Sequence, residues 1–133
     1  MDISVARLMT SDLQTVSPDT LVEDAAETML EHDIGSVIVV DDDNRLRGIL
    51  TSTDFTQIVA ERSPKDETPV SRYMSEDVLT ASAQDDIRDV ADAMIEHTIH
   101  HVPVVDDTEG VIGIITTTDL AAYLSRVQTP SPS

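Results

Sequence analysis

The sequence contains no cysteine and no tryptophan, and it has few aromatic residues of any kind. Of its 133 residues, only 2% are Phe, Trp or Tyr, whereas 40% are hydrophobic. The absence of cysteine excludes disulfides and thiolate metal sites. The core must therefore consist of Val, Ile, Leu, Met and Ala, and such aliphatic cores are typical of parallel or mixed sheets covered by helices.

Long hydrophobic runs are also missing. The longest runs, such as Val37–Val40 and Val111–Ile115, are far too short to cross a bilayer. The chain opens with neither a basic nor a hydrophobic leader segment, so we expect a soluble, cytoplasmic protein. A chain of 133 residues fits one compact domain or two small ones that share a core.

Basic residues are scarce, because 26 acidic residues stand against 8 basic ones and Lys65 is the only lysine. A net charge of −18 disfavours binding to nucleic acid and to anionic membranes, since both repel it. The acidic residues are spread over both halves, which indicates a charged folded surface rather than an acidic tail. This composition resembles that of cytosolic proteins from halophilic archaea, where molar salt screens charge repulsion to within about 3 Å. An ordinary acidic mesophilic protein is the alternative.

The chain repeats itself. Met9 and Met74 lie 65 residues apart, and this offset holds without a gap for about fifty residues. Identical pairs at this offset include Val5/Val70, Arg7/Arg72, Asp24/Asp89, His32/His97, Gly48/Gly113, Thr51/Thr116 and Asp54/Asp119. Chance does not produce so many identities in one register, so the sequence predicts a duplicated unit.

Proline and polar residues mark the boundaries of the two copies. Residues 63–69 form a polar stretch with two prolines that indicates a linker. We therefore expect a first domain over 1–62, a linker over 63–69 and a second domain over 70–128. Residues 129–133, rich in Pro and Ser, are predicted to form a disordered tail.

Each copy is predicted to fold as β-α-β-β-α, which makes the fold class α/β. In the first copy, Leu13–Val16 is expected to be a strand, and Thr20 and Glu23 have the spacing of a capping box for the helix that follows. In the second copy Asp85 is the expected cap. The stripes Val22, Ala25, Ala26, Met29, Leu30 and Ile87, Val90, Ala91, Met94, Ile95 have helical spacing and are predicted to face inward.

Two β-branched runs in each copy, joined by a short turn, predict an antiparallel hairpin. These runs are Val37–Val40 with Leu46–Leu50, and Val102–Val105 with Val111–Ile115. A last helix is expected to begin near Thr51 or Thr116. The residues expected on its inner face are Phe55, Ile58 and Val59 in the first copy and Leu120, Tyr123, Leu124 and Val127 in the second.

Three segments give the copies a family resemblance. They are Gly48–Asp54 (Gly-Ile-Leu-Thr-Ser-Thr-Asp), His100–Asp106 (His-His-Val-Pro-Val-Val-Asp) and Gly113–Asp119 (Gly-Ile-Ile-Thr-Thr-Thr-Asp). With the order of the units, they resemble the CBS (cystathionine beta-synthase-type) domain, and the resemblance covers roughly residues 5–127. It implies a Bateman module, in which two CBS repeats pack as a pseudo-twofold pair and bind adenine-containing ligands in the cleft between them.

The resemblance implies the residues that bind the ligand. They are Thr15, Val16, Ser36, Thr51, Thr53 and Asp54 in the first copy and Thr80, Ala81, His100, His101, Thr116, Thr118 and Asp119 in the second. Asp54 and Asp119 take the family's ribose-binding position, and a carboxylate can accept both ribose hydroxyls. Thr51 and Thr116 offer hydroxyls beside a helix N-terminus, which favours anions. The clefts of this family are composite, so a residue of one copy can serve a ligand held mainly by the other.

Simpler interpretations stay open for the same residues. Thr51 with Asp54, and Thr116 with Asp119, have the spacing of plain helix-capping pairs. His100 and His101 stand where relatives often place basic residues against phosphate, but they could equally be surface histidines at a helix end. The first copy has Gly35 and Ser36 at those positions, so we expect unequal sites, with the stronger phosphate-binding set in the second copy.

Other polar clusters give weaker signals. His97, His100 and His101 do not keep ligand spacing, because the first helix of the second copy should end near Thr98. The Asp41–Asn44 segment lacks the glycine and the distal glutamate of an EF-hand loop, so a solvated turn is expected. We predict no metal site. Nucleophile and Walker motifs are absent, so an enzyme is not expected.

Function is therefore predicted to be regulatory. The hypothesis is a stand-alone protein of signal transduction that binds AMP, ADP, ATP or S-adenosylmethionine, changes conformation and signals to an unknown regulated protein. The alternative is a constitutive interaction or scaffold module without a ligand. Self-association to a homodimer is expected from the family, while nucleic acid, membrane and cofactor are not expected as partners.

Overall fold

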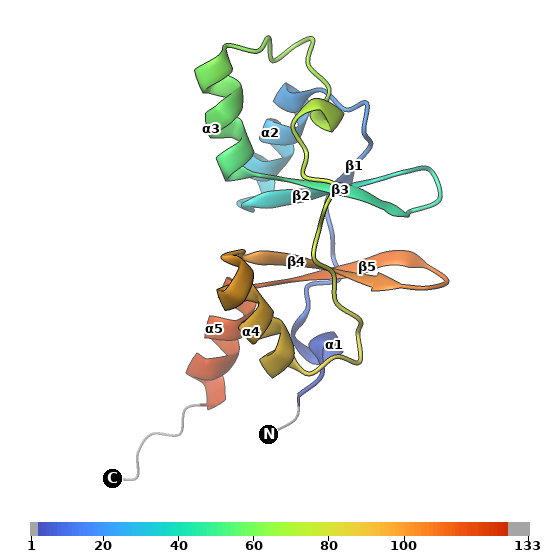
Figure 1. The fold of residues 1–133 in the computed structure, drawn as a ribbon, viewed down its shortest axis with the longest axis vertical. Coiled ribbons are helices and arrows are strands. Elements are labelled where there is room, and N and C mark those ends of the chain that lie inside the picture. The colour runs from blue at the N-terminus through green and yellow to red at the C-terminus, as the bar shows by residue number, and fades with distance from the viewer. Residues whose placement is uncertain (1–2, 128–133) are drawn as a thin grey trace. The chain divides into compact units, whose positions relative to one another are not determined.

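The computed structural model describes residues 3–127, together with all side chains in that range except that of Val127. The chain forms two compact units (Figure 1). Unit 2 contains Gln14–Val78 and the short stretch Glu109–Val111. Unit 1 contains the chain up to Leu13, Leu79–Thr108 and the chain from Ile112 onward.

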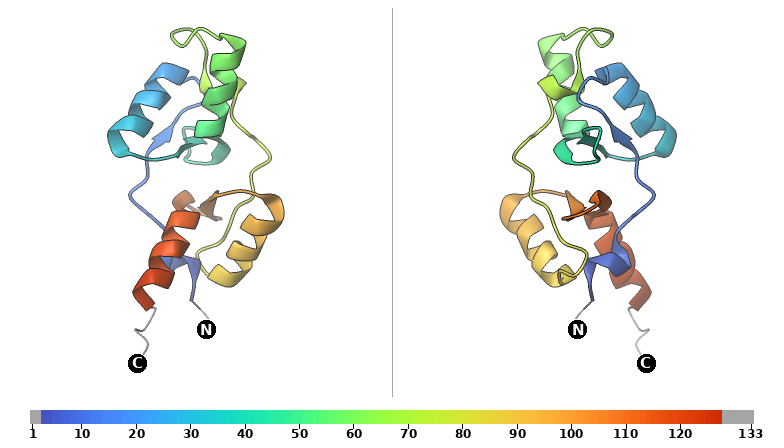
Figure 2. Two further views of the ribbon diagram at one scale, coloured as in Figure 1. Left: turned by 90° about the vertical axis from the view of Figure 1, so that its left-hand side faces the viewer. Right: turned by 90° about the vertical axis from the view of Figure 1, so that its right-hand side faces the viewer.

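Unit 2 places two helices on one face of a three-stranded sheet (Figures 1 and 2). Its elements are β1 (Thr15–Val16), α2 (Val22–His32), β2 (Ser36–Val40), β3 (Leu46–Thr51), α3 (Ser52–Glu61) and a 3-10 turn η1 (Val70–Arg72). Strand β1 runs parallel to β2, and β2 pairs antiparallel with β3 as the predicted hairpin. The buried side chains of this unit include Val22, Val37, Val39, Leu50, Ile58 and Val70.

Unit 1 repeats this arrangement with a sheet of only two strands among the described residues (Figure 2). Its elements are α1 (Val5–Leu8), α4 (Ile87–His97), β4 (His101–Asp106), β5 (Gly110–Thr116) and α5 (Thr117–Val127), the first two residues of β5 grouping with unit 2. The strand expected at the start of this repeat is reduced to one parallel bridge between Ala81 and Val104. The mixed α/β fold with two similar repeats is thus confirmed. The buried side chains of unit 1 include Val5, Val90, Met94, Val102, Val104 and Ile115.

The segment before each repeat's first strand packs on the unit built from the other repeat. Thr10 forms an antiparallel bridge with Ile114, and Ser75 forms the equivalent bridge with Ile49. The glycines make this approach possible, because a Cβ on Gly113 would lie 2.7 Å from Met9 Sδ. A Cβ on Gly48 would lie 2.7 Å from the carbonyl oxygen of Ser75. Both glycines are therefore needed for the close approach of another segment of the same chain.

Two predicted helix caps are wrong. The Thr20 hydroxyl accepts the N–H of Ser17 at 3.1 Å within a turn, and α2 begins after Leu21 without a side-chain cap. The first N–H groups of α2 instead donate to the carbonyls of Thr68 and Lys65, at 2.9 and 3.3 Å. This tertiary contact satisfies the helix end, so a capping side chain is not needed there.

The equivalent correction applies to the second repeat. Asp85 accepts the N–H of Ser82 at 2.9 Å, and Asp86 caps α4 by accepting the N–H of Arg88 at 3.0 Å. The N–H of Ile87 donates to the carbonyl of Ile3 at 2.9 Å. Here too, a side chain expected to cap the helix serves the preceding turn.

Four aliphatic residues expected to face inward are exposed. Leu30 is 82% exposed and its equivalent Ile95 is 78% exposed, while Val59 is 76% and its equivalent Leu124 is 64% exposed. On α2 and α4 only the residues nearest the sheet, such as Val22, Met29 and Met94, are buried. Leu30 and Ile95 lie at the edge of the helical stripe, so a sheet on one side of the helix does not cover them. The side chain of Val127 lies outside the described part of the chain.

The tips of the two hairpins meet within unit 2. The Asn44 side-chain amide donates to the carbonyls of Glu109 and Val111 at 2.9 and 2.8 Å, and Val111 N–H donates to the Asn44 carbonyl at 3.0 Å. Gly110 has φ +82°, and a Cβ there would lie 2.1 Å from the Asn44 carbonyl oxygen. Only glycine fits this position without a shift of the backbone.

The segment expected as a linker, residues 63–69, is tied to unit 2. Thr68 is 3% exposed, and the carbonyls of Lys65 and Thr68 accept the α2 bonds given above. Tyr73 donates to Glu61 Oε1 at 2.8 Å and shares a hydrogen bond with Ser63, and Gln57 donates to Glu61 Oε2 at 2.7 Å. The hydrogen bonds from Gln57 and Tyr73 hold the pKa of Glu61 below its usual value. The tail expected over 129–133 lies outside the described residues.

Candidate functional site

In unit 1 the candidate site is built at the junction of β5 and α5. Thr116 donates its N–H and its hydroxyl to Asp119 Oδ2, at 2.8 and 3.1 Å, and the N–H of Asp119 donates to Thr116 Oγ1 at 3.2 Å. These bonds form a reciprocal helix cap, so Thr116 and Asp119 do act as the helix-capping pair that their spacing allowed. The other oxygen, Oδ1, accepts a long bond of 3.5 Å from the hydroxyl of Thr10.

Unit 2 has the same junction between β3 and α3. Thr51 donates its N–H to Asp54 Oδ2 at 2.7 Å and its hydroxyl to the same oxygen at 3.3 Å. Asp54 is half-buried, and among residues 3–127 nothing donates to its Oδ1. In both units, capping therefore occupies one carboxylate oxygen and leaves the other open or weakly held for a ligand.

Thr10 and Ser75 were missed as candidate residues. Each follows a methionine that covers a site glycine, and each pairs with the strand that leads into the Thr-x-x-Asp turn. A signal was present, because the 65-residue offset aligns Thr10 with Ser75 as well as Met9 with Met74. Local pattern could not reveal the contact, since 109 residues separate Thr10 from Asp119.

A free helix N–H lies beside each carboxylate. At the start of α5, the N–H of Thr117 donates to the His100 carbonyl at 3.0 Å and that of Asp119 to Thr116 Oγ1. The N–H of Thr118 has no acceptor within the described range, and Thr118 is exposed. Thr53 holds the equivalent position in α3, where Ser52 N–H donates to the Gly35 carbonyl at 3.1 Å. Such an N–H at a helix N-terminus can bind an anion.

The residues before the hairpin differ between the units. The carbonyl of His100 accepts a bond from the first residue of α5, which brings His100 beside the Thr116–Asp119 turn. His101 is half-buried, and burial holds its pKa below the usual 6.5, with the charge of His100 acting in the same direction and that of Asp119 opposing it. In unit 2 the buried Ser36 pairs with Thr51 across the hairpin.

The remaining predicted residues lie on the first strand position of each repeat. Thr15 and Val16 pair with Ile38 and Val39 in β2, Thr15 being exposed and Val16 packing against the core. Ala81 is 6% exposed, its N–H donates to the Pro103 carbonyl at 3.0 Å, and Thr80 beside it is exposed. Thr15, Val16 and Ala81 thus lie beside the middle of β2 or β4, and within residues 3–127 no hydrogen bond joins them to the Thr-x-x-Asp turns.

Neither the histidines nor the acidic turn gathers into a metal centre. Between Ile3 and Val127, no three His, Asp or Glu side chains are grouped closely enough to hold an ion. Asp41 Oδ1 accepts the N–H groups of Asp43 and Arg45 at 2.9 and 3.0 Å, which lowers its pKa. No helix in the described range has the length and apolar character needed to cross a bilayer.

Comparison with known proteins agrees with these repeats. The family model of the CBS domain matches residues 5–61 and again residues 70–126. An uncharacterized 17.7 kDa protein of Acidianus ambivalens is 31% identical over 129 residues, which span 97% of this chain and 77% of that protein. A homoserine O-acetyltransferase of Methanosalsum zhilinae is 36% identical over 114 residues, but the matched part spans 86% of this chain and only 22% of that enzyme.

Among solved structures, the CBS domain pair of protein MJ0100 is similar over nearly its whole length. Its TM-score is 0.85 at 27% identity, and the match covers 95% of this chain and 98% of that one. That structure is a complex with 5′-methylthioadenosine and S-adenosyl-L-methionine. Because the family model matches both repeats and the fold is shared with a CBS domain pair, the chain belongs to the CBS-domain family and carries two CBS domains in tandem.

Proposed function

We propose that this chain is a stand-alone cytoplasmic regulator, not an enzyme, that binds adenine-containing ligands such as AMP, ADP, ATP or S-adenosylmethionine and signals to a regulated protein by a change of conformation. The observation that carries the proposal is the capped Thr-x-x-Asp turn, present once in each unit. Each turn offers a half-buried carboxylate with one oxygen outside the cap and a free helix N–H.

The chemistry of this turn fits a nucleoside with a phosphate or another anionic group. The open carboxylate oxygen accepts a ribose hydroxyl, and the Thr53 or Thr118 N–H donates to an anionic oxygen. The similar pair of protein MJ0100 in complex with two adenosine compounds supports adenine as the base. Because Oδ2 serves the cap, we expect a second ribose hydroxyl to share that oxygen or displace Thr10 from Asp119.

Signalling requires the ligand to bind two conformations with different affinity. The homoserine O-acetyltransferase that matches over 22% of its length supports this role, because there a similar segment is joined to a larger enzyme. In the present case, we propose that the target is a separate protein and that the chain itself forms a homodimer.

Calorimetric titration tests ligand binding directly. Adenosine, AMP, ADP, ATP and S-adenosylmethionine are titrated into the protein in molar potassium chloride, with guanosine and GMP as matched controls. Binding of at least one adenine compound without binding of its guanine counterpart is expected. Absence of heat from every adenine compound would contradict the proposal.

One observation favours the second candidate, a constitutive interaction module without ligand. Asp54 and Asp119 each cap a helix, so both residues would be needed for stability even if neither site bound anything. If the adenine titrations are silent while the protein still captures its regulated target, this second function holds instead.

A further inference from the structure

Each unit has a leading segment that ends in a methionine and a hydroxyl residue. The leading segments are residues 3–10 in unit 1 and residues 70–75 in unit 2. Met9 follows α1 in the first segment, and Met74 follows η1 in the second. Both methionine side chains are half-buried, and each packs at the edge of the core of its unit.

The other methionines in the described part of the chain are less accessible. Met29 and Met94 lie in the two cores and are only 7% and 3% exposed. The chain also has no cysteine, whose thiolate would otherwise react with an oxidant. Among the described residues, Met9 and Met74 are therefore the sulfur-containing side chains open to a small oxidising solute.

Each of these two methionines lies against a glycine of the strand that leads into a Thr-x-x-Asp turn. A Cβ on Gly113 would lie 2.7 Å from Met9 Sδ and 3.2 Å from its Cγ. A Cβ on Gly48 would lie 2.8 Å from Met74 Sδ and 2.9 Å from its Cγ. Because the thioether already fills the space of the missing side chain, an oxygen added on the glycine side of the sulfur has no room there.

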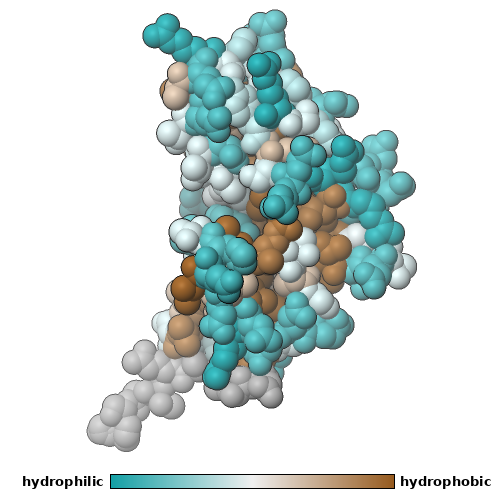
Figure 3. Space-filling view, in the orientation of Figure 1, coloured by the Kyte–Doolittle hydropathy of each residue, from teal (hydrophilic) through white to brown (hydrophobic). Residues whose placement is uncertain are grey.

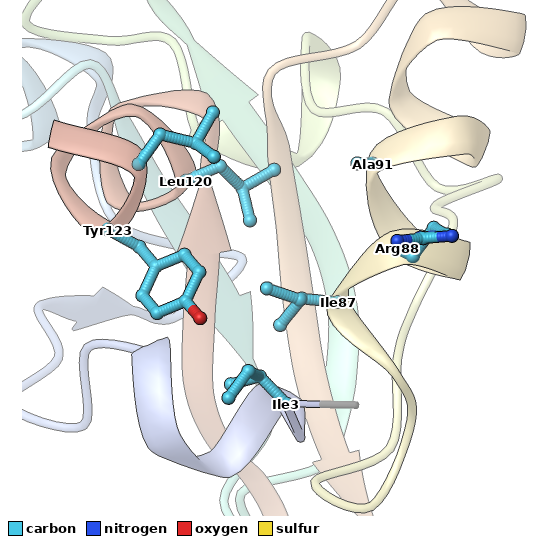
Figure 4. A pocket seen from close by; sticks show the side chains of 7 residues that line it. Ile3, Ile87, Arg88, Ala91, Leu120 and Tyr123 are labelled. Atoms are coloured by element: carbon cyan, nitrogen blue, oxygen red, sulfur yellow. The ribbon is translucent and has the colours of Figure 1, made fainter. Parts of the chain in front are cut away.

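The far end of the leading segment in unit 1 is anchored separately. The carbonyl of Ile3 accepts the N–H of Ile87 at 2.9 Å. The Ile3 side chain lines a hollow of about 240 Å³ together with Ile87 and Tyr123 (Figure 4). The start of the segment is thus held by α4 and α5, whereas its end is held on the glycine strand by Met9.

Beyond the methionine, the main chain of each leading segment pairs with the same strand. The N–H of Ile114 donates to the Thr10 carbonyl, and the N–H of Ile49 donates to the Ser75 carbonyl, each at 3.0 Å. Both isoleucines stand two residues before the threonine of a Thr-x-x-Asp turn. Release of a leading segment therefore removes a hydrogen-bond partner from the strand directly beside the candidate site.

We propose that Met9 and Met74 are paired sites of reversible oxidation by neutral peroxides, and that the sulfoxides release the two leading segments. The thioether sulfur takes one oxygen of hydrogen peroxide, so an S–O bond forms and the O–O bond breaks. The sulfur loses two electrons, and the second oxygen leaves with both protons as water. A sulfoxide is polar, so its packing against the glycine strand is less favourable than its exposure to water.

The charge of the chain selects the class of oxidant. Figure 3 shows a mainly hydrophilic face, and the net charge of −18 repels oxidants that are anions. Hydrogen peroxide and alkyl hydroperoxides carry no charge at neutral pH, so this repulsion does not act on them. A neutral peroxide is therefore the oxidant that fits this surface at any salt concentration.

The consequence for ligand binding rests on the proposed function. Oxidation loosens the strand beside the carboxylate that is proposed to bind ribose. Adenosine affinity is therefore expected to fall by about fivefold or more, the lower end of the usual coupling between two sites. Methionine sulfoxide reductases regenerate the thioether, so treatment with both of these enzymes is expected to restore the affinity.

Hydrogen exchange tests release of the leading segments without any ligand. The full chain is treated with hydrogen peroxide, peptide mass spectrometry locates the added oxygens, and NMR follows amide exchange. Oxidation is expected first at Met9 and Met74. Exchange of the Ile114 and Ile49 N–H groups should then accelerate by about tenfold, as for the lost burial of one or two methylene groups. Val105 is the control, because its N–H bonds outside the leading segments.

Single variants provide matched controls, since leucine has a similar volume and is not oxidised. Met9→Leu is expected to abolish the effect of peroxide at Ile114 and to leave the effect at Ile49. Met74→Leu is expected to do the reverse. Unchanged exchange in the oxidised wild type, equal acceleration at both amides in either variant, or first oxidation of the buried methionines would overturn the proposal.

Calorimetry with adenosine separates this inference from the proposed function. The untreated, oxidised and re-reduced wild type are compared with a double variant, Met9→Leu with Met74→Leu, before and after peroxide. Weaker binding by the oxidised wild type, recovery on reduction and no effect of peroxide on the double variant are expected. Equal binding by oxidised and untreated wild type would overturn the inference. If the untreated protein does not bind adenosine, the proposed ribose contact fails, and the exchange experiment alone decides the inference.

Discussion

Single residues in the candidate site serve two purposes that compete for the same atoms. Asp119 caps α5 through Oδ2 and is the proposed ribose acceptor, while Thr10 occupies its Oδ1 at 3.5 Å. The motif predicted Asp119 and its threonine, because both lie in one short segment. It could not predict Thr10, whose position depends on pairing between segments far apart in the chain.

Replacing Asp119 with Ala is expected to weaken adenosine binding by about 1.5–3 kcal/mol, the usual range for a hydrogen bond to a charged group. Asp86→Ala is the matched control, since Asp86 also caps a helix of unit 1 but lies outside the site. Both variants should lose stability, by roughly 0.5–2 kcal/mol each. Calorimetry showing equal affinity losses in the two would refute a ribose contact.

Protonation of His101 is expected to make AMP binding depend on pH. Burial lowers its pKa, so the ring is neutral at pH 7 and gains its charge only below the usual 6.5. AMP affinity should therefore rise as pH falls below about 6.5, whereas adenosine affinity should not. Replacing His100 and His101 together with Ala should remove this rise and weaken AMP alone. Parallel loss of adenosine binding would exclude a phosphate contact.

The same lowered pKa has a consequence for stability. A histidine that is harder to protonate when folded favours folding above its unfolded pKa, and this contribution is lost as pH falls through the folded value. His101→Gln should thus make the thermal midpoint less sensitive to acid as the pH falls below about 6.5. Midpoints measured across this range for both proteins test the sign, and an unchanged slope would contradict it.

At the scale of elements, periodicity predicted the starts of α2 to α5 and both hairpins to within a residue or two, but neither α1 nor η1. It could not predict how helix ends are satisfied, because the N–H groups of α2 bond to carbonyls from residues 65 and 68. Nor could it place Leu30 and Val59, since helical spacing defines a stripe but not how far the sheet covers it. The faces of α2 and α3 became clear only once both helices lay on one sheet.

The hairpin tips offer a test at this scale. Gly110→Ala should destabilise the protein by at least about 1–2 kcal/mol, because alanine is strained at φ +82° and its Cβ would overlap the Asn44 carbonyl. Asp42→Ala, at an exposed position of the other turn, should stay within about 0.5 kcal/mol of wild type. Chemical unfolding measures both. A Gly110→Ala variant as stable as the control would show that the tip contact does not constrain the backbone.

For the whole molecule, net charge decides the behaviour in solution. A charge of −18 on 133 residues repels itself, and salt screens that repulsion. The thermal midpoint should therefore rise from low to molar potassium chloride, with sucrose as an uncharged control for general solute effects. A midpoint that stays flat or falls with salt would argue against adaptation to high salt.

The reciprocal placement of Met9 and Met74 bears on how such a chain arose. A chain with one repeat would have only one leading segment, the one that carries the methionine, to cover its glycine. Each such chain could cover its own glycine, or two identical chains could exchange their leading segments. In the present chain the leading segment of each repeat covers the glycine of the other repeat. A gene fragment cut at the sequence repeat would therefore encode a half without its natural cover, whereas one spanning Gln14–Val78 would encode a half that brings it along.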